Sequence, residues 1–536
     1  MSQPPDPDAA APGPDAAEPR SRTGWLDRIE RVGNALPDPV TLFFLGALAV
    51  ALLSQLAVFL DWSVTRSVAE LDAGGRPTGA LTEVAVQPIG LLDSEGVYWM
   101  LSSLVKNFMD FPPLGVVLVG MLGIGLAEKV GFIGALLKTV LLGVPRALLT
   151  PAMVFTGILS SMGLDAGYVV LPPVAAALYA AVGRSPLVGL AAVFAGVSAG
   201  FSANLFVTSL DPLLAGFTTQ AARLIDPGYE VAATANLGFM MVSTVVLTLV
   251  GWAVTAWWVE PRLARRTADE GGPAPVTQSE LAAQRLSATE RRGLALALLA
   301  LVAALGVVLV AVWLPGAPLH GIDGKFPRWV RVIVPLIFVG FLVPGLVYGV
   351  ATGSLRSDKD AAKLMGETMA GMGPYIVLAF VASQFIAFFT HSRLGEMLAL
   401  TGGQLLARAG LPDAGLMVGF IGVVMLGNLF IGSMSAKYAF FAPVFVPMFM
   451  QVGISPELTQ VAYRVGDSVT NVITPLNPYM VILLVFMQRY VKNAGIGSLV
   501  ALMLPYAAVF AVIWTLLLTA WIATGLPLGP EGPLTY

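Results

Sequence analysis

Long apolar runs recur along the chain, and they restrict its fold more than any other feature. A run of about 18 or more apolar residues is long enough to cross a bilayer as a helix. Charged residues make up 12% of the sequence, whereas soluble globular proteins carry about 25%. Backbone polar groups in lipid must be satisfied internally, which favours helices. The sequence therefore predicts an all-α polytopic membrane protein.

Nine segments are expected to cross the membrane. They lie at about 40–60, 113–130, 187–210, 236–258, 293–314, 329–350, 376–391, 460–484 and 499–524. Two further apolar regions, about 147–182 and 414–451, are interrupted by the polar sequences "SSMGLDAGY" and "GNLFIGSMSAKY". We interpret both as re-entrant hairpins that turn back without crossing.

The distribution of basic residues supports this topology. Nine crossings with two hairpins place most Lys and Arg residues on one side, together with the N-terminus, as the positive-inside rule requires. If one hairpin crossed once, the basic loop at 259–292 would leave that side. We therefore expect a cytoplasmic N-terminus and a periplasmic C-terminus.

The same reading divides the chain into five parts. Residues 1–39 are a Pro- and Ala-rich tail, expected to be disordered, that ends in an interfacial helix. Two membrane halves, 40–258 and 293–525, flank a cytoplasmic linker at 259–292, and residues 526–536 form a C-terminal tail.

The two halves resemble each other in sequence. "VGRSPLVGLAAVFAGVS" begins at residue 182 and "VGISPELTQVAYRVGDS" at residue 452. Their alignment places Gly183, Ser185, Pro186, Gly196 and Ser198 on Gly453, Ser455, Pro456, Gly466 and Ser468. Chance is the alternative, because Gly, Ser and Pro are common in membrane helices. With hairpins entering from opposite sides, the pattern predicts the inverted repeat of many secondary transporters.

Two of the crossings are expected to lose their helix within the membrane. The stretches are "SAGFSANLFVTSLDP" at 198–212 and "SVTNVITPLNP" at 468–478. Non-helical backbone at membrane depth survives only inside protein or beside a water-filled cavity. The Ser, Thr and Asn side chains of these stretches suit a cation or a polar solute.

Ionisable residues inside the membrane are candidates for function. Asp165 lies in the first hairpin tip, where capping the following helix is the alternative role. Arg464 and Asp467 are three residues apart and share a helix face, so an internal salt bridge competes with ligand binding. Lys437, at the second tip, is expected to snorkel to the surface.

Several function classes are excluded. The chain has no cysteine and two histidines, which argues against thiol chemistry and multi-histidine metal sites. It lacks a P-loop and a potassium-channel filter, and no serine with a nearby histidine suggests hydrolysis. The net charge of -3 argues against nucleic acid as a partner. We expect neither an enzyme nor a bound cofactor, but a carrier or, as the alternative, a channel.

The chain resembles the AbgT family of transporters. The resemblance is carried by "GNLFIGSMSAKYAFFAPVFVPMF", "GISPELTQVAYRVGDSVTNVITPLNPY" and "SSMGLDAGYVVLPP", and it covers about residues 40–525. It implies a homodimer in the bacterial inner membrane with an ion-transporter-superfamily-like fold. It also implies transport of p-aminobenzoyl-glutamate and export of sulfonamide antimetabolites, a form of antimicrobial resistance, driven by a sodium or proton gradient. A sodium-coupled importer of another carboxylate is the alternative.

The resemblance also assigns site residues. The substrate and transport positions it implies are Asp165, Ser435, Tyr438, Pro456, Arg464, Asp467 and Pro475. Asn428 and Asp467 are the side chains it implies for a sodium ion. The family usually has tryptophan where this chain has Tyr438. We expect Tyr438 to form an aromatic wall of the solute site, with an interfacial anchor as the alternative.

Overall fold

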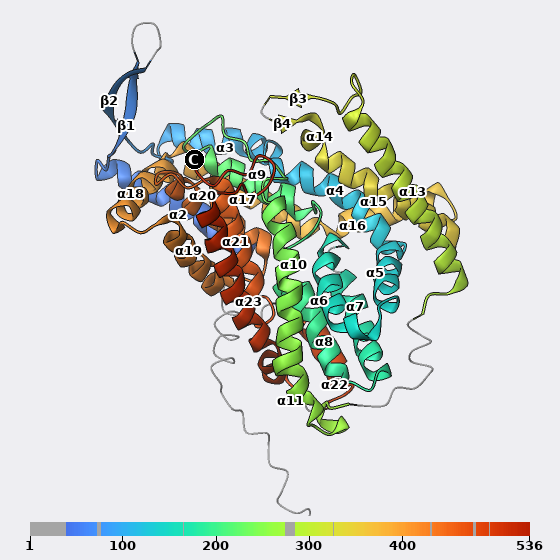
Figure 1. Cartoon of the computed structure of the whole chain (residues 1–536). Helices are drawn as coiled ribbons and strands as arrows, with labels where there is room; N and C mark the ends of the chain where they lie inside the picture. Colours follow the sequence, from blue (N-terminus) through green and yellow to red (C-terminus); the bar gives the residue numbers. More distant parts are fainter. Residues whose placement is uncertain are drawn as a thin grey trace, which may run out of the picture.

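The computed structural model is a helical bundle with two small β-hairpins (Figure 1). The structure describes residues 39–71, 77–163, 166–273, 285–324, 326–428, 431–474, 477, 479–492 and 494–536. The predicted N-terminal tail and interfacial helix therefore lie outside the described residues, apart from Pro39.

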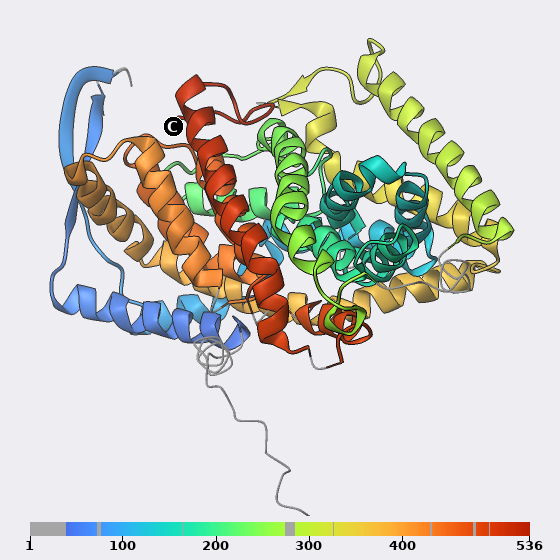
Figure 2. The same ribbon diagram turned by 60° about the horizontal axis from the view of Figure 1, so that its bottom comes forward.

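The first half contains nine α-helices and a β-hairpin in its described residues. They are α2 (Pro39–Phe59), β1 (Val64–Leu71), β2 (Pro77–Val86), α3 (Ser94–Met109), α4 (Pro112–Lys129), α5 (Phe132–Leu142), α6 (Leu149–Leu159), α7 (Ala166–Ala181), α8 (Pro186–Phe194), α9 (Leu210–Ala222) and α10 (Leu237–Val254). Strands β1 and β2 pair antiparallel, with Val64 opposite Val86. The all-α prediction missed this hairpin, which projects from one corner of the bundle (Figures 1 and 2).

The linker and the second half complete the bundle. They contain α11 (Glu260–Ala264), α13 (Ala288–Trp313), β3 (Ile322–Asp323), β4 (Phe326–Pro327), α14 (Arg328–Arg331), α15 (Ile333–Thr352), α16 (Asp358–Gly371), α17 (Gly373–His391), α18 (Leu394–Ala409), α19 (Asp413–Asn428), α20 (Met434–Met450), α21 (Pro456–Thr470), α22 (Tyr479–Gln488) and α23 (Ile496–Thr524). In Figure 1, α10 and α23 run side by side through the middle of the molecule, and the two helices pack against each other.

Seven helices in the described residues are long and apolar enough to span a membrane. Each overlaps one of seven predicted crossings, namely 40–60, 113–130, 236–258, 293–314, 329–350, 376–391 and 499–524; the stretch that overlaps 113–130 runs from Ser94 to Lys129 because it also includes α3. The other two, 187–210 and 460–484, are interrupted: α8 ends in a π-helical turn at Ala195–Ala199, and the described residues between α21 and α22, 471–474 and 477, are not helical. Both predicted helix breaks are confirmed, whereas the total number of crossings stays a prediction.

The predicted hairpin regions each form two helices around a polar turn. Helices α6 and α7 flank the first turn, and α19 and α20 flank the second. In each half the interrupted helix packs against both: α8 contacts α6 and α7, and α21 contacts α19 and α20. Whether these regions turn back within the bilayer, and whether the halves form an inverted repeat, stay predictions.

Matched glycines permit this close packing. A Cβ on Gly196 would lie 2.2 Å from the carbonyl oxygen of Val154 in α6. A Cβ on Gly466 would lie 2.8 Å from the carbonyl oxygen of Ile421 in α19. Both distances are too short for a carbon atom, so only glycine lets the backbones approach this closely. These two glycines are equivalent in the sequence alignment of the halves.

Candidate functional site

Helix α21 is buried along its whole length although almost half of its residues are polar. All of Pro456–Thr470 is buried, including Glu457, Gln460, Arg464 and Asp467. Ser455 caps the helix by accepting from the N–H of Leu458 at 3.0 Å, and proline at the first helical position needs no N–H partner. Such a helix requires polar partners from other segments, because an unpaired buried polar group costs about 1–3 kcal/mol.

The C-terminal segment supplies partners at the start of α21. The Ser455 N–H donates to the Leu534 carbonyl at 3.1 Å, and its hydroxyl donates to the Pro533 carbonyl at 2.7 Å. The Tyr536 N–H donates to the Gly453 carbonyl at 2.9 Å. Residues 533–536 therefore pack against the N-terminal end of α21.

Arg464 forms an ion pair with Asp211 at the start of α9. Its Nη1 lies 2.6 Å from Asp211 Oδ1, and the two side chains are 1% and 8% exposed. Its Nη2 donates to the Ser202 carbonyl at 2.9 Å, while its Nε is buried without a partner among the described residues. The guanidinium thus joins α21 to the first helix break.

Asp211 is itself held within that break. Its Oδ2 accepts from the Thr208 N–H at 2.6 Å and from the Thr208 hydroxyl at 2.9 Å. A carboxylate with these donors and a guanidinium is well satisfied in its charged form.

The two helix breaks also contact each other directly. The Ser202 N–H donates to Ser468 Oγ at 3.2 Å, and Asn477 Nδ2 donates to Ser198 Oγ at 3.1 Å. Ser198 and Ser468 are equivalent positions of the two sequence halves. Each break therefore satisfies part of the polar backbone or side chains of the other.

Asp467 pairs with Lys437 of α20. Lys437 Nζ lies 2.6 Å from Asp467 Oδ1, and the side chains are 0% and 1% exposed. The expected snorkelling of Lys437 to the surface is therefore wrong, because its ammonium finds a carboxylate in the interior. The alternative of an internal Arg464–Asp467 salt bridge is also wrong in this structure, because each residue pairs with another helix.

Asn428, the last residue of α19, joins this pair to the second break. Its Oδ1 accepts from Lys437 Nζ, and its Nδ2 donates to the Asp467 carbonyl at 2.7 Å and to Asn471 Oδ1 at 2.8 Å. Its own carbonyl accepts from the Thr474 hydroxyl at 3.0 Å. Asn428 thus links the C-terminal end of α19 to the non-helical residues that follow α21.

The two side chains predicted to bind sodium thus both bind the Lys437 ammonium. Asp467 Oδ2 has no hydrogen-bond partner among the described residues, but the single charge of this carboxylate is already balanced. A sodium ion beside it would add an uncompensated positive charge to the interior, which costs several kcal/mol. With Lys437 in this position the residues do not fit sodium, and the sodium assignment stays a prediction.

Tyr438 lies in the interior beside this cluster. The residue is 0% exposed, and its hydroxyl lies 2.6 Å from Thr218 Oγ1 of α9. Its ring centre is 4.3 Å from that of Tyr463. Full burial rules out the interfacial anchor that was the alternative for this residue. The aromatic wall stays a prediction.

The comparisons with known proteins now identify the family. The chain matches the model of the "AbgT putative transporter family" over residues 24–536. It belongs to the AbgT family. It is also 36% identical over 521 residues to the p-aminobenzoyl-glutamate transport protein of Escherichia coli (strain K12). The aligned region covers 95% of this chain and 96% of that protein.

Two solved structures of transporters resemble this AbgT protein. The YdaH transporter of Alcanivorax borkumensis has a TM-score of 0.82 at 39% identity, over 92% of this chain and 100% of that chain. MtrF of Neisseria gonorrhoeae is described within a class of antimetabolite efflux pumps. It has a TM-score of 0.84 at 40% identity, over 95% of this chain and 100% of that chain. The AbgT protein is thus a multi-pass membrane transporter of small molecules, and not an enzyme.

The other residues that the AbgT resemblance implies fall in three places. Pro456 is buried at the first position of α21. Ser435 is half-buried in the first turn of α20, with its Oγ 3.3 Å from Ser433 Oγ. Asp165 and Pro475 lie outside the described residues, so their assignment stays a prediction.

Sequence reasoning missed several contributors to this site. It recognised the break at 198–212 and assigned its Ser and Asn side chains collectively to a cation or polar solute, but it assigned no role to Asp211 and no specific partner to Ser202 or Asn204. Asn204 Nδ2 donates to Ser161 Oγ at 2.9 Å and joins the first break to the first hairpin tip. The available signal for Asp211 was an ionisable residue beside a predicted break, the same signal that drew attention to Asp467.

Proposed function

We propose that this AbgT protein is an ion-gradient-driven secondary transporter of p-aminobenzoyl-glutamate and related aromatic carboxylates, and that it also exports sulfonamide antimetabolites. The proposal is supported by two relatives, the p-aminobenzoyl-glutamate transport protein of Escherichia coli and the Neisseria gonorrhoeae protein of the antimetabolite efflux class. It includes a homodimer in the bacterial inner membrane with a cytoplasmic N-terminus and a periplasmic C-terminus.

One observation carries the proposal for an anionic solute: a buried guanidinium sits where the two helix breaks meet. Arg464 already holds the carboxylate of Asp211 at 2.6 Å, and its Nε has no partner among the described residues. A guanidinium offers several donors in a fork that matches a carboxylate. A substrate carboxylate would bind by using the free Nε or by competing with Asp211.

Coupling to a cation gradient would act through the second ion pair, where a cation that displaced Lys437 would bind Asp467. Asp467 lies one helical turn from Arg464 on α21, but it faces Lys437 and Asn428 instead of Asp211. Binding events at the two pairs would therefore act on the same short, fully buried helix. Alternating access by movement of α21 and its neighbours is the mechanism that a secondary transporter with an inverted repeat would use.

The alternatives are a sodium-coupled importer of a different carboxylate and a channel. A carrier saturates with solute and shows counterflow of unlabelled solute, whereas a channel with a fixed pathway shows neither. The ion pairs favour a carrier, because they join α21 to α9 and to α20, so that binding at either pair would be coupled to movement of these helices.

Transport by the purified protein in proteoliposomes tests the proposal. Uptake and efflux of p-aminobenzoyl-glutamate and of a sulfonamide would be measured with a sodium gradient or a proton gradient imposed separately. We expect saturable movement that depends on one of the two gradients, above that of protein-free liposomes. If neither solute moves under either gradient, or if flux stays linear in solute without counterflow, the proposed function is wrong.

A further inference from the structure

A cavity lies at the place where one membrane span ends and another begins, and α21 does not line it. It has a volume of about 440 Å³ and lies between the end of the span Leu237–Ala264 and the start of the span Ile496–Thr524. Figure 1 places this region at the lower end of α10 and α23, beside α11 and α22. None of the lining residues belongs to α20 or α21, so the cavity is separate from the candidate transport site.

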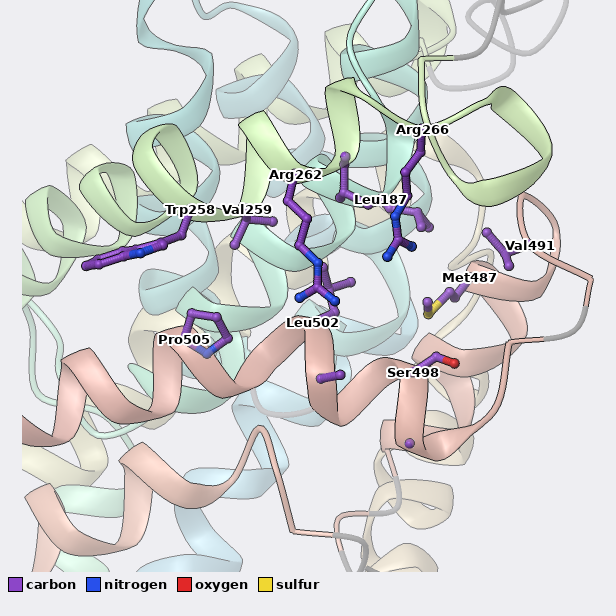
Figure 3. A pocket seen from close by; sticks show the side chains of 13 residues that line it. Leu187, Trp258, Val259, Arg262, Arg266, Met487, Val491, Ser498, Leu502 and Pro505 are labelled. Carbon is purple, nitrogen blue, oxygen red and sulfur yellow. The ribbon is translucent and has the colours of Figure 1, made fainter. Parts of the chain in front are cut away.

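Two arginines supply the charge of this cavity. Arg262 and Arg266 are four residues apart and both extend into it from above α23 (Figure 3). Neither guanidinium has an ion pair or hydrogen bond with any of the described side chains, since the nearby Glu260 is already paired with Arg184. Asp269 and Glu270 share an adjoining cleft with Arg266, but Arg489 and Lys492 line that cleft as well. The mouth of the cavity is therefore positively charged.

The rest of the cavity is apolar. Its walls include Leu187, Trp258, Leu502 and Pro505, and Ser498 is the hydroxyl among the lining residues (Figure 3). An occupant that satisfied only the arginines would leave this apolar surface in contact with water. The cavity thus fits a molecule with an anionic head and a hydrocarbon chain.

The position of the cavity indicates where such a molecule comes from. Trp257 and Trp258, which precede Arg262, are 75% and 56% exposed, and exposed tryptophans next to basic residues are typical of the membrane boundary. The positive-inside rule assigns this boundary to the cytoplasmic side, where anionic lipids attract basic segments. Basic pockets between membrane helices on that side bind phospholipid headgroups.

We propose that this cavity binds an anionic phospholipid of the surrounding bilayer. The lipid phosphate lies between Arg262 and Arg266, where a guanidinium can donate two hydrogen bonds to phosphate oxygens. An acyl chain lies along Leu502 and Pro505 of α23, beneath Trp258. The site joins α11 to α23, which are far apart in the sequence.

The test measures phosphatidylglycerol binding to the full-length protein in mixed micelles by native mass spectrometry. Phosphatidylcholine is the zwitterionic comparison. We expect saturable binding of phosphatidylglycerol, reduced about 30-fold in the Arg262→Gln/Arg266→Gln variant, since each basic residue near the surface contributes roughly fivefold. The matched control is Arg285→Gln/Arg291→Gln, which removes two exposed charges outside the cavity and should leave binding unchanged.

Two further arms separate the parts of the proposal. Ala501→Trp fills the apolar part of the cavity without removing charge, and we expect it to weaken phosphatidylglycerol binding as well. Inorganic phosphate and glycerol 3-phosphate test the headgroup alone, and neither should compete at equal concentration. Equal loss in the two double variants, or full competition by inorganic phosphate, would overturn the lipid assignment.

Discussion

Replacing Lys437 by methionine tests whether its ion pair with Asp467 holds the interior of this AbgT protein together. Methionine keeps a long flexible stem and removes the ammonium. At the observed 2.6 Å, the gross attraction is about 6 kcal/mol at an effective dielectric constant near 20. Desolvation offsets much of this energy, but removing one partner leaves a buried, uncompensated charge. The expected loss of stability is therefore about 3–5 kcal/mol.

The assay is thermal unfolding of the solubilised protein. The matched control is Lys106→Met, because Lys106 and Asp110 form an ion pair whose side chains are 77% and 62% exposed, and exposed pairs contribute about 0–1 kcal/mol. We expect Lys437→Met to lower the midpoint several times more than the control does.

A double variant separates loss of the pair from loss of packing. Lys437→Met combined with Asp467→Leu removes both charges, and buried pairs replaced by hydrophobic residues of similar volume are often close to neutral in stability. We expect it to recover most of the midpoint that Lys437→Met loses. If the double variant is as unstable as the sum of the two single variants, or if Lys437→Met behaves like the exposed control, the reasoning about the pair is refuted.

The remaining predictions concern the ligands. Arg464→Gln should reduce transport of p-aminobenzoyl-glutamate more than that of an uncharged sulfonamide, measured in proteoliposomes; equal losses would indicate a purely structural guanidinium. If Asp211 competes with the substrate for that guanidinium, Asp211→Asn should lower the half-saturating concentration of p-aminobenzoyl-glutamate, and an unchanged value argues against competition. Tyr438→Ala should raise that concentration about 2- to 13-fold, the value of a stacked aromatic pair, while Tyr438→Trp should not; unchanged half-saturation in the alanine variant excludes the aromatic wall. Finally, Lys437→Ala leaves the oxygens of Asn428 and Asp467 free, so sodium chloride should raise its unfolding midpoint above that in choline chloride. If sodium chloride raises the unfolding midpoint of the wild-type protein by as much, Lys437 does not occupy the cation position.

Much of the fold follows from the sequence alone. Long apolar runs predict spanning helices because a bilayer leaves no other partner for the backbone, and seven of them are found as such. The two helix breaks were predicted from local chemistry, since Pro475 and Pro478 disfavour a helix and Ser and Asn side chains compete for backbone groups. The β1–β2 hairpin and the short amphipathic helices α3, α16 and α18 carry no such run, and these were missed.

The partners of the buried charges were decided by the tertiary structure. Spacing along a helix shows that Arg464 and Asp467 could reach each other, but it contains no information about side chains that arrive from elsewhere. Folding brings Asp211 to Arg464 from 253 positions away, and it brings Lys437 to Asp467 across the contact between α20 and α21. In a dry interior each charge needs a counter-charge with good geometry, and two separate pairs satisfy that need better than one local pair beside an unpaired lysine. The sequence thus determines where polar groups enter the membrane, and the packing of the helices against one another determines what each of them binds.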